Sequence, residues 1–509
     1  MDDMWTLYIS LAALLIPALT CLLAVSSLVC ARRKYSHLPS PKMSSRFFGH
    51  YFDIKREREK GIRPGQNPPD GLLLKWASDI GTLYILFLVW KPILIVLDPE
   101  DIQKVHMNRL HPKPKTITTI VGDVFGQRAS LRSLFVLQDY STWHPRRKHY
   151  DLAFSKSYLT GLVPTFDRCC EKCLSGLKPF ADGVVQVPMK RHLLKFSQNT
   201  IWKVAFACDI SDECDPTSGA DVVPVGTKVF KAFQDKLHNF PFQHFQFFHP
   251  FECEGYRNAV RTLRGVGKEC ILKRMKVLDD GGEVPNDILT FILKSATTDS
   301  AVDIETLLDD FAIFYLAGQE TVGNTLSLAL VLVLQHPEVL ERLLAEIDEV
   351  LGSRTSVTAE DLEKLKYTEQ VVHETMRLYS PAGFMVVSKE SPPGGVTLSG
   401  YHIPAGTHMA THPACVHRMP QYFEEPDSFN PSRFDPENKK PSPFIYFPFG
   451  VGHRMCIGMH FAMVEMKLML CRLIQAYDIT LPPNYKLIVV EQFIRQSHDD
   501  ITCTLVPRK

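Results

Sequence analysis

The stretch FGVGHRMCIG, residues 449–458, places one cysteine among turn glycines, an aromatic residue and an arginine, directly before a long apolar-periodic segment. That segment, residues 457–474, is predicted to be a helix, which puts Cys456 at the start of a helix. A helix N-terminus stabilises negative charge and lowers the pKa of a thiol placed there. Gly450 and Gly452 permit a turn that would aim backbone N–H groups at the sulfur. The stretch therefore predicts a thiolate that the backbone holds ready to bind a metal.

The alternative for Cys456 is a buried free cysteine, since cysteines are often fully buried in protein cores. Such a cysteine would need none of its spaced neighbours. The spacing F-x-x-G-x-R-x-C-x-G resembles the haem-binding signature of the cytochrome P-450 monooxygenases. The resemblance implies that Cys456 is the axial ligand of the iron of haem b, a ligand that favours O–O cleavage. It also implies that Phe449 shields the sulfur, Gly458 leaves room for the porphyrin and Arg454 reaches a propionate.

Residues 303–335 form a long apolar segment that is predicted to be one helix of about 50 Å. The segment is too polar in its centre to span a membrane, and a helix that is apolar nearly all round belongs inside a large protein. Its centre reads AGQET, which resembles the oxygen-activation motif of the same family. The resemblance implies that Ala317 and Gly318 let haem and dioxygen approach the backbone. It makes Glu320 and Thr321 an acid–alcohol pair that relays protons during catalysis.

Thr321 is expected to hydrogen-bond to the carbonyl of Ala317, because threonine side chains in helices bond four residues back and bend the helix. A local widening of the helix would then open a groove for dioxygen and water. The alternative is an ordinary helix interior in which the threonine is satisfied by its own backbone. The cysteine motif favours the catalytic interpretation.

Glu374 and Arg377 form an E-x-x-R pattern, in which residues three apart share one helix face and can pair. Alone, this pattern is usually a solvated surface pair that contributes little. The stretch FNPSRF, residues 429–434, resembles the F-x-P-x-R-F motif of the family. The resemblance implies that Glu374, Arg377 and Arg433 form a buried charge network behind the thiolate loop, with a structural role.

Residues 143–147, WHPRR, match a W-x-x-x-R pattern that in the family covers a haem propionate. The resemblance implies that Trp143 and Arg147 contact the cofactor, since arginine pairs well with planar carboxylates. Pro145 is unusual inside this segment, although proline is tolerated in the first turn of a helix. Other cations are either ordinary exposed residues or part of a basic face for an acidic electron donor: Arg146, Lys148, Lys467 and Arg472.

The 509 residues carry a formal net charge of +1, so nucleic acid binding has no electrostatic support. The 13 cysteines are odd in number and scattered, which indicates a reducing compartment. Cys169, Cys170 and Cys173 lack a second ligand pair at metal-binding spacing and are interpreted as ordinary helix thiols. No linker or repeat divides the chain after its N-terminus. We therefore expect a single catalytic haem domain over residues 35–509.

Residues 5–31 form an apolar run long enough to span a bilayer. Asp2 and Asp3 precede the run and a basic cluster at residues 32–34 follows it. Basic flanks stay on the cytosolic side, whereas a cleaved signal peptide would have the opposite flanks. Residues 1–34 are therefore predicted to be a single-pass anchor in the endoplasmic reticulum membrane, with the catalytic domain in the cytosol.

Two β-strands joined near Lys91 and Pro92 are expected over residues 83–98, with short strands near 383–411 and 487–506. Most other segments are predicted to be helices, so the fold class is mainly α with small β-sheets. The resemblance implies the cytochrome P-450 fold, with haem between the long central helix and the helix that follows the cysteine.

Several segments resemble the cholesterol 24-hydroxylases of the family: residues 151–155, 283–290, 378–382 and 446–449. The resemblance implies a monooxygenase that hydroxylates the side chain of a sterol. Val387 stands where those enzymes have a propionate-directed arginine, and Gly383 where they have a tryptophan. The pocket is therefore expected to differ in shape. The aromatic stretch 240–251 is either a membrane-dipping access region for a lipid or part of the core.

The chain carries no G-x-G-x-x-G fingerprint for a dinucleotide. Electrons are therefore expected from NADPH through a separate haemoprotein reductase, with O2 as co-substrate and a lipidic molecule as substrate. Three alternatives remain: a fatty-acid or xenobiotic monooxygenase, a haem-thiolate isomerase, and a non-catalytic haem protein. The pair Glu320 and Thr321 favours oxygen activation over the last two.

Overall fold

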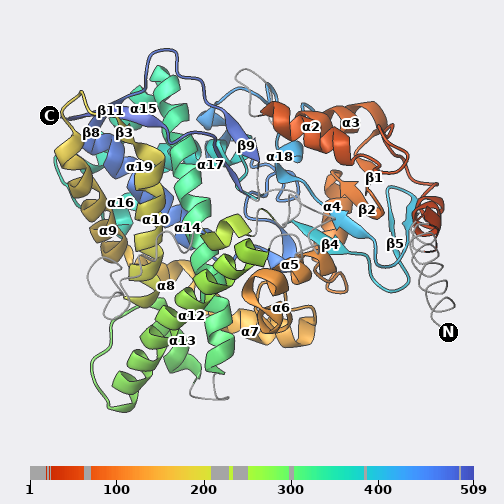
Figure 1. The fold of residues 1–509 in the computed structure, drawn as a ribbon. Helices are drawn as coiled ribbons and strands as arrows, with labels where there is room; N and C mark the ends of the chain where they lie inside the picture. Colours follow the sequence, from red (N-terminus) through yellow and green to blue (C-terminus); the bar gives the residue numbers. More distant parts are fainter. Residues whose placement is uncertain are drawn as a thin grey trace, which may run out of the picture.

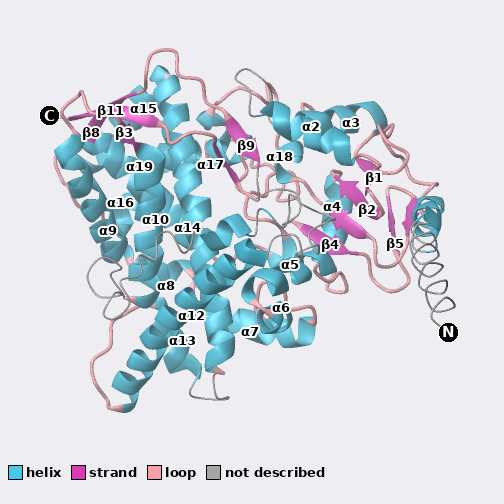
Figure 2. Cartoon of the chain, in the orientation of Figure 1, coloured by secondary structure: helices cyan, strands magenta, loops and turns pink. Residues whose placement is uncertain are grey.

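The computed structural model describes residues 19, 22, 25–61, 70–207, 228–232, 235, 250–296, 303–382, 387–491 and 494–508 (Figure 1). Most described elements are helices, and the strands form four small sheets (Figure 2). The predicted class, mainly α with small β-sheets, is confirmed. In both views, the strand-rich part lies on the side of the N-terminus, and a group of long helices lies on the side of the C-terminus.

The largest sheet has four strands in the order β1-β2-β7-β4: β1 (Leu83–Leu88), β2 (Lys91–Val96), β7 (His408–Ala410) and β4 (Ser388–Glu390). The predicted hairpin β1–β2 is confirmed, but its turn lies at Val89 and Trp90, earlier than expected. β2 and β7 run parallel, and β4 pairs with β7 so that Lys389 lies opposite Met409. This pairing holds Lys389 in the interior of the strand-rich part.

The remaining strands form two hairpins and a three-stranded sheet. The hairpins are β5 (Val396–Leu398) with β6 (Tyr401–Ile403), and β9 (Val489–Glu491) with β10 (Arg495–Ser497). The third sheet has the order β3 (Val187–Pro188), β11 (Thr502–Pro507) and β8 (Tyr477–Thr480). The short strands expected near residues 383–411 and 487–506 are therefore present.

The long central helix is α14 (Ile304–Gln335), as the apolar segment predicts. Asp303 caps its N-terminus by accepting a hydrogen bond from the Glu305 amide. α14 packs against α10 (Met189–Phe206), where a Cβ on Gly323 would lie 2.8 Å from the Leu194 Cα. Among the described residues, α14 alone has the length and apolar composition of a membrane span, but 83% of that window is buried inside the protein. It is therefore the core helix of the fold.

The other helices surround α14 and the large sheet. The earlier helices along the chain are α2 (Tyr51–Gly61), α3 (Asp70–Ile80), α4 (Pro99–Met107), α5 (Lys115–Phe125), α6 (Gln127–Arg132), α7 (Tyr140–Ala153), α8 (Lys156–Thr160) and α9 (Val163–Leu177). The later helices are α12 (Pro250–Asp279), α13 (Ile288–Ala296), α15 (Pro337–Leu351), α16 (Ala359–Lys364), α17 (Lys366–Leu378), α18 (Pro413–Val416) and α19 (Met459–Ala476). Three 3-10 turns complete the set: η1 (Lys178–Phe180), η3 (Pro431–Phe434) and η4 (Gly452–Arg454).

Three sequence predictions fall wholly or largely outside the described residues: the membrane anchor over residues 5–31, Gly383, and the aromatic stretch up to residue 249. Of the anchor, residues 25–31 are described and helical, and the apolar side chains of Leu19, Leu22, Val25 and Val29 are exposed. The division into an anchor and one catalytic domain stays a prediction.

Candidate functional site

The cysteine loop closes on itself just before α19. The 3-10 turn η4 precedes Cys456, and Gly458 is the N-cap of α19. The Cys456 amide donates to the Phe449 carbonyl at 2.9 Å, and the Gly458 amide donates to the sulfur of Cys456. A Cβ on Gly458 would lie 3.9 Å from that sulfur. The loop therefore holds the thiol beside a helix start, as the motif predicts.

The two turn glycines of the loop differ in what surrounds them. Both have positive φ, +74° for Gly450 and +76° for Gly452, which side chains rarely adopt. A Cβ on Gly452 would lie 2.3 Å from the carbonyl oxygen of His106 at the end of α4, whereas a Cβ on Gly450 would meet nothing within 4 Å. Gly452 is thus needed for the close approach of the loop to α4.

The pKa of Cys456 is raised above its usual value. Although the residue is exposed, protein surrounds the sulfur on its other sides, and this desolvation outweighs the Gly458 amide and the charge of Arg147, both of which lower the pKa. The lowered pKa expected from the helix start is therefore wrong for the chain alone. A bound metal cation would reverse the balance, since a coordinating thiol is deprotonated outright.

Trp143, Arg147 and Arg454 lie together beside the loop. Trp143 is buried, and the guanidinium carbon of Arg454 lies 3.9 Å from its ring centroid. Arg147 donates from Nη1 to the Met455 carbonyl at 2.8 Å and pairs with Asp151 at 2.7 Å. Pro145 lies inside α7, in its second turn. The structure thus brings the predicted tryptophan–arginine motif to the cysteine loop.

One donor of Arg454 has no partner in the described part of the chain. Its Nη2 donates to the Leu137 carbonyl at 2.7 Å, while Nη1 is buried and makes no hydrogen bond there. Burial, followed by the charge of Arg147, lowers the pKa of Arg454 to about 10. An unsatisfied buried guanidinium donor is costly, so this position fits a carboxylate supplied from outside the chain.

The middle of α14 carries accessible surface although the helix is buried on either side of it. Ala317 is exposed and Gly318 and Thr321 are partly exposed, whereas nearly all other residues from 307 to 333 are buried. α14 also contacts α19, the helix that follows Cys456. The centre of α14 is therefore accessible at Ala317 and Thr321, as expected for a surface that receives a bound group.

Thr321 donates from Oγ1 to the Ala317 carbonyl at 2.7 Å, which confirms the predicted hydrogen bond. The helix is nonetheless assigned as α through the whole motif, so the predicted local widening is not seen. A Cβ on Gly318 would lie 3.3 Å from the Ile201 side chain on α10. Gly318 thus permits close packing between α10 and α14.

Glu320 is buried on the side of the helix that Asn324 shares. Its carboxylate accepts a hydrogen bond from Asn324 Nδ2 at 3.2 Å, and no hydrogen bond within the described part of the chain joins it to Thr321. Burial raises the pKa of Glu320, against the hydrogen bond from Asn324 and the charge of Lys190. A raised pKa favours a carboxyl group that carries a proton, but proton passage to Thr321 needs a rotation or a bridging water.

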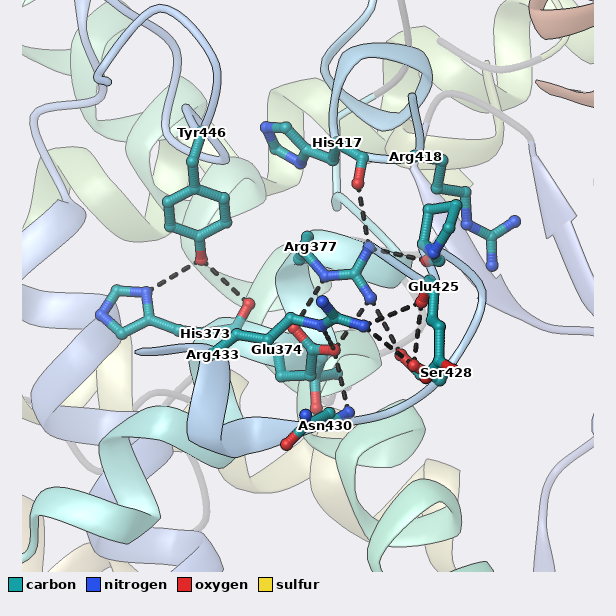
Figure 3. Close-up of polar contacts among 12 residues, drawn as sticks. His373, Glu374, Arg377, His417, Arg418, Glu425, Ser428, Asn430, Arg433 and Tyr446 are labelled. Atoms are coloured by element: carbon teal, nitrogen blue, oxygen red, sulfur yellow. Dashed lines mark hydrogen bonds and ion pairs between the residues drawn. The ribbon is translucent and has the colours of Figure 1, made fainter. Parts of the chain in front are cut away.

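Glu374, Arg377 and Arg433 form the buried network that the motifs imply (Figure 3). Arg377 binds Glu374 through two hydrogen bonds of 2.7 and 2.8 Å, and both side chains are 0% exposed. Arg433 lies 3.3 Å from the same carboxylate. Arg377 also donates to three backbone carbonyls of the segment before η3, those of His417, Pro426 and Ser428. The network therefore fixes that segment to α17.

The basic face considered for an electron donor is not present as proposed. Lys467 is buried and pairs with Glu369 at 2.7 Å, and Arg472 is buried and pairs with Glu171 at 2.6 Å. Arg146 pairs with the buried Asp310 of α14. Of the four cations, only Lys148 is exposed. The charges of the other three form ion pairs between helices, which sequence spacing alone does not reveal.

Two buried lysines near Arg454 belong to no motif and were not predicted from the sequence: Lys113 and Lys389. A signal for Lys389 was its place in a short strand of largely buried residues. A lysine at such a position calls for a partner, because lysine is almost never fully buried unless it is paired. Lys389 stands two residues after Val387, which is buried and carries no charge.

The residues of this site fit a haem group: a thiol on a closed loop, accessible surface in the middle of a core helix, and an unsatisfied buried guanidinium. The cytochrome P-450 family model matches residues 39–500, and the chain therefore belongs to the cytochrome P-450 family of haem-thiolate monooxygenases. The family uses haem iron, O2 and electrons from a reductase partner.

Known proteins of the same family are similar over most of the chain. Cytochrome P-450 4d2 of Drosophila melanogaster is 26% identical, covering 83% of this chain and 90% of that protein. Cytochrome P-450 3A6 of Oryctolagus cuniculus is 28% identical, covering 80% and 82%. The crystal structure of the cytochrome P-450DA haem domain superposes with a TM-score of 0.78 at 20% identity, covering 93% of this chain and 98% of that chain. This likeness confirms the predicted fold.

Proposed function

We propose that this protein is a membrane-bound monooxygenase that hydroxylates a lipidic substrate, with a sterol side chain as the favoured class. The observation that supports a monooxygenase is that Ala317 and Thr321 are accessible although most of α14 is buried. α14 contacts α19, the helix that follows Cys456. The sterol class is supported by the sequence segments described above. The membrane anchor is supported by the apolar run over residues 5–31 and its basic flank.

Each residue of the site has a defined part in this proposal. Haem, when bound, supplies the activation of O2 with electrons from the reductase. The Cys456 sulfur binds the iron, with the Gly458 amide donating to it, and Phe449 shields this side. Trp143, Arg147 and Arg454 hold a propionate.

Thr321 of α14 would present its hydroxyl to the bound group, and its hydrogen bond to the Ala317 carbonyl must open before it passes a proton. Glu320, whose pKa burial raises, holds the proton that Thr321 passes on.

Replacement of the proposed proton-relay alcohol should uncouple the reaction. In Thr321→Ala, we expect NADPH consumption to continue while product formed per NADPH falls by about tenfold or more, because a positioned proton donor is lost. Thr325→Ala is the matched control, since Thr325 makes the same hydrogen bond, to Thr321 at 2.7 Å, one turn further along a buried face. Coupling that is unchanged in Thr321→Ala would remove the proton role from this residue.

The substrate class is tested by reconstitution of the full chain with an NADPH-dependent haemoprotein reductase in phospholipid vesicles. Sterols, long-chain fatty acids and apolar xenobiotics are compared by the shift they cause in the haem absorbance and by NADPH-dependent product. A hydroxylated sterol side chain is the expected product. Product from fatty acids or xenobiotics alone would identify a fatty-acid or xenobiotic monooxygenase. Rearrangement of lipid peroxides without reductase would identify a haem-thiolate isomerase. A chain that starts at residue 35 should float with the vesicles less than the full chain.

A further inference from the structure

Two buried lysines lie beside the arginine of the cysteine loop. Lys113 precedes α5 and Lys389 lies in β4, and they are 8% and 4% exposed. Lys389 donates from Nζ to the His111 carbonyl at 3.2 Å, and the Lys113 ammonium lies 4.6 Å from the ring centroid of Phe135. Neither contact neutralises a charge. Both lysines are close enough to Arg454 for the like charges to affect their pKa values.

Among the described residues, no carboxylate forms an ion pair with Lys113, Lys389 or Arg454. The nearby Arg147 does form an ion pair, with the exposed Asp151. Burial, followed by the charges of Lys113 and Arg454, lowers the pKa of Lys389 to about 7. Burial, followed by Arg454, lowers that of Lys113 to about 8.

The neighbouring histidines add no negative charge. Burial is the main cause that lowers the pKa of His106, to about 3, and of His111. Two buried lysines and the partly buried Arg454 thus have no anion among the described residues, which is costly unless something else supplies the negative charge.

We propose that Lys389 and Lys113, together with Arg454, bind a propionate of the haem, so that two ammonium groups hold this edge of the cofactor. The inference rests on the proposed haem site and goes beyond it by assigning two residues that no motif marks. The two propionates of haem supply the negative charge that the cluster lacks. An ammonium is a point charge with rotatable donors, so a lysine pair can receive a carboxylate from a range of directions.

The direct test measures how tightly the purified holoprotein retains haem, by transfer of haem to an excess of a haem-scavenging globin. Lys389→Met keeps an unbranched side chain that is one atom shorter and removes its charge. We expect haem release to accelerate by about tenfold or more, because a charge-assisted hydrogen bond to a carboxylate is lost. Lys389→Arg keeps the charge and should release haem within about threefold of the parent rate. Lys113→Met should accelerate release in the same direction.

The thermal midpoint of the haem-free protein separates a role in haem binding from a structural role. If Lys389 binds haem, its charge stabilises the haem-bound protein but not the haem-free protein. Without haem the buried ammonium has no anion, so Lys389→Met should leave the thermal midpoint unchanged or raise it. Lys467→Met is the matched control: this lysine is equally buried but has a carboxylate partner, so its loss should lower the midpoint with and without haem. A midpoint of haem-free Lys389→Met that falls as in this control would overturn the proposal, as would haem release at the parent rate.

Reconstitution with haem dimethyl ester identifies the propionate itself. The ester has no carboxylate charge, so parent and Lys389→Met should release it at the same rate. An unchanged difference between the two proteins would mean that the lysine acts on something other than a propionate. If Lys389→Met holds no haem at all, haem retention by Lys389→Arg still supports a role for the positive charge. Loss of haem from Lys389→Arg as well would contradict that role. These readouts need no turnover, so they stand whether or not a sterol is hydroxylated.

Discussion

Cys456→Ala is expected to abolish the red-shifted absorbance band that a thiolate ligand gives to the reduced haem–carbon monoxide complex, and all turnover with it. The expectation follows from the loop, in which the Cys456 amide is tied to Phe449 and the Gly458 amide donates to the sulfur. The alanine variant keeps the backbone bonds but has no atom to bind the iron. The measurement is the difference spectrum of purified protein, with haem content determined in parallel.

The control for this variant is Cys471→Ala, which changes a cysteine inside α19, the helix that follows the Cys456 loop. Cys471 is fully buried in α19, and burial raises its pKa to about 12, so it is a protonated core thiol. Its truncation should leave the band position unchanged and lower stability by a cavity cost of about 1–2 kcal/mol. A thiolate band that persists in Cys456→Ala would show that another residue binds the iron, and the assignment of the loop would be wrong.

The central helix, the β1–β2 hairpin and the helix after the cysteine could be predicted from the sequence because each is encoded by a local pattern. Apolar periodicity indicates α14 and α19, and two short apolar runs on either side of Lys91 and Pro92 indicate the hairpin. The hydrogen bond from Thr321 to Ala317 could likewise be predicted, since it depends only on helix geometry.

The features that escaped prediction depend on residues far apart in the sequence. Lys467 and Arg472 resemble surface cations locally, but Glu369 and Glu171 pair with them across helix contacts. Similarly, nothing near Lys389 in the sequence shows that Lys113 and Arg454 lie close to it. The raised pKa of Cys456 also escaped, because desolvation depends on the whole surrounding fold rather than on the helix start alone.

Glu374→Gln is expected to lower the free energy of unfolding by about 3–5 kcal/mol, because it leaves the buried guanidinium of Arg377 and the partly exposed one of Arg433 without their anion. Arg377 would keep its three carbonyl contacts, but these neutralise no charge. A loss of this size is a large part of the total stability of a typical domain, about 5–15 kcal/mol, so little haem-bound protein should accumulate. The readout is the urea midpoint of the circular dichroism transition, together with haem content.

Two comparisons separate the buried network from ordinary ion pairs. Arg433→Gln should cost less than Glu374→Gln, since Arg433 is 15% exposed and its loss leaves Glu374 still bound by Arg377 and by the Asn430 amide. Lys156→Gln breaks a pair with Glu363 whose side chains are 69% and 67% exposed, so it should cost only about 0–1 kcal/mol. If Glu374→Gln were as stable as Lys156→Gln, the network would not be what holds the segment before η3 against α17. The decisive difference is desolvation: the exposed pair is solvated by water in either state, whereas Arg377 has no water to replace the carboxylate.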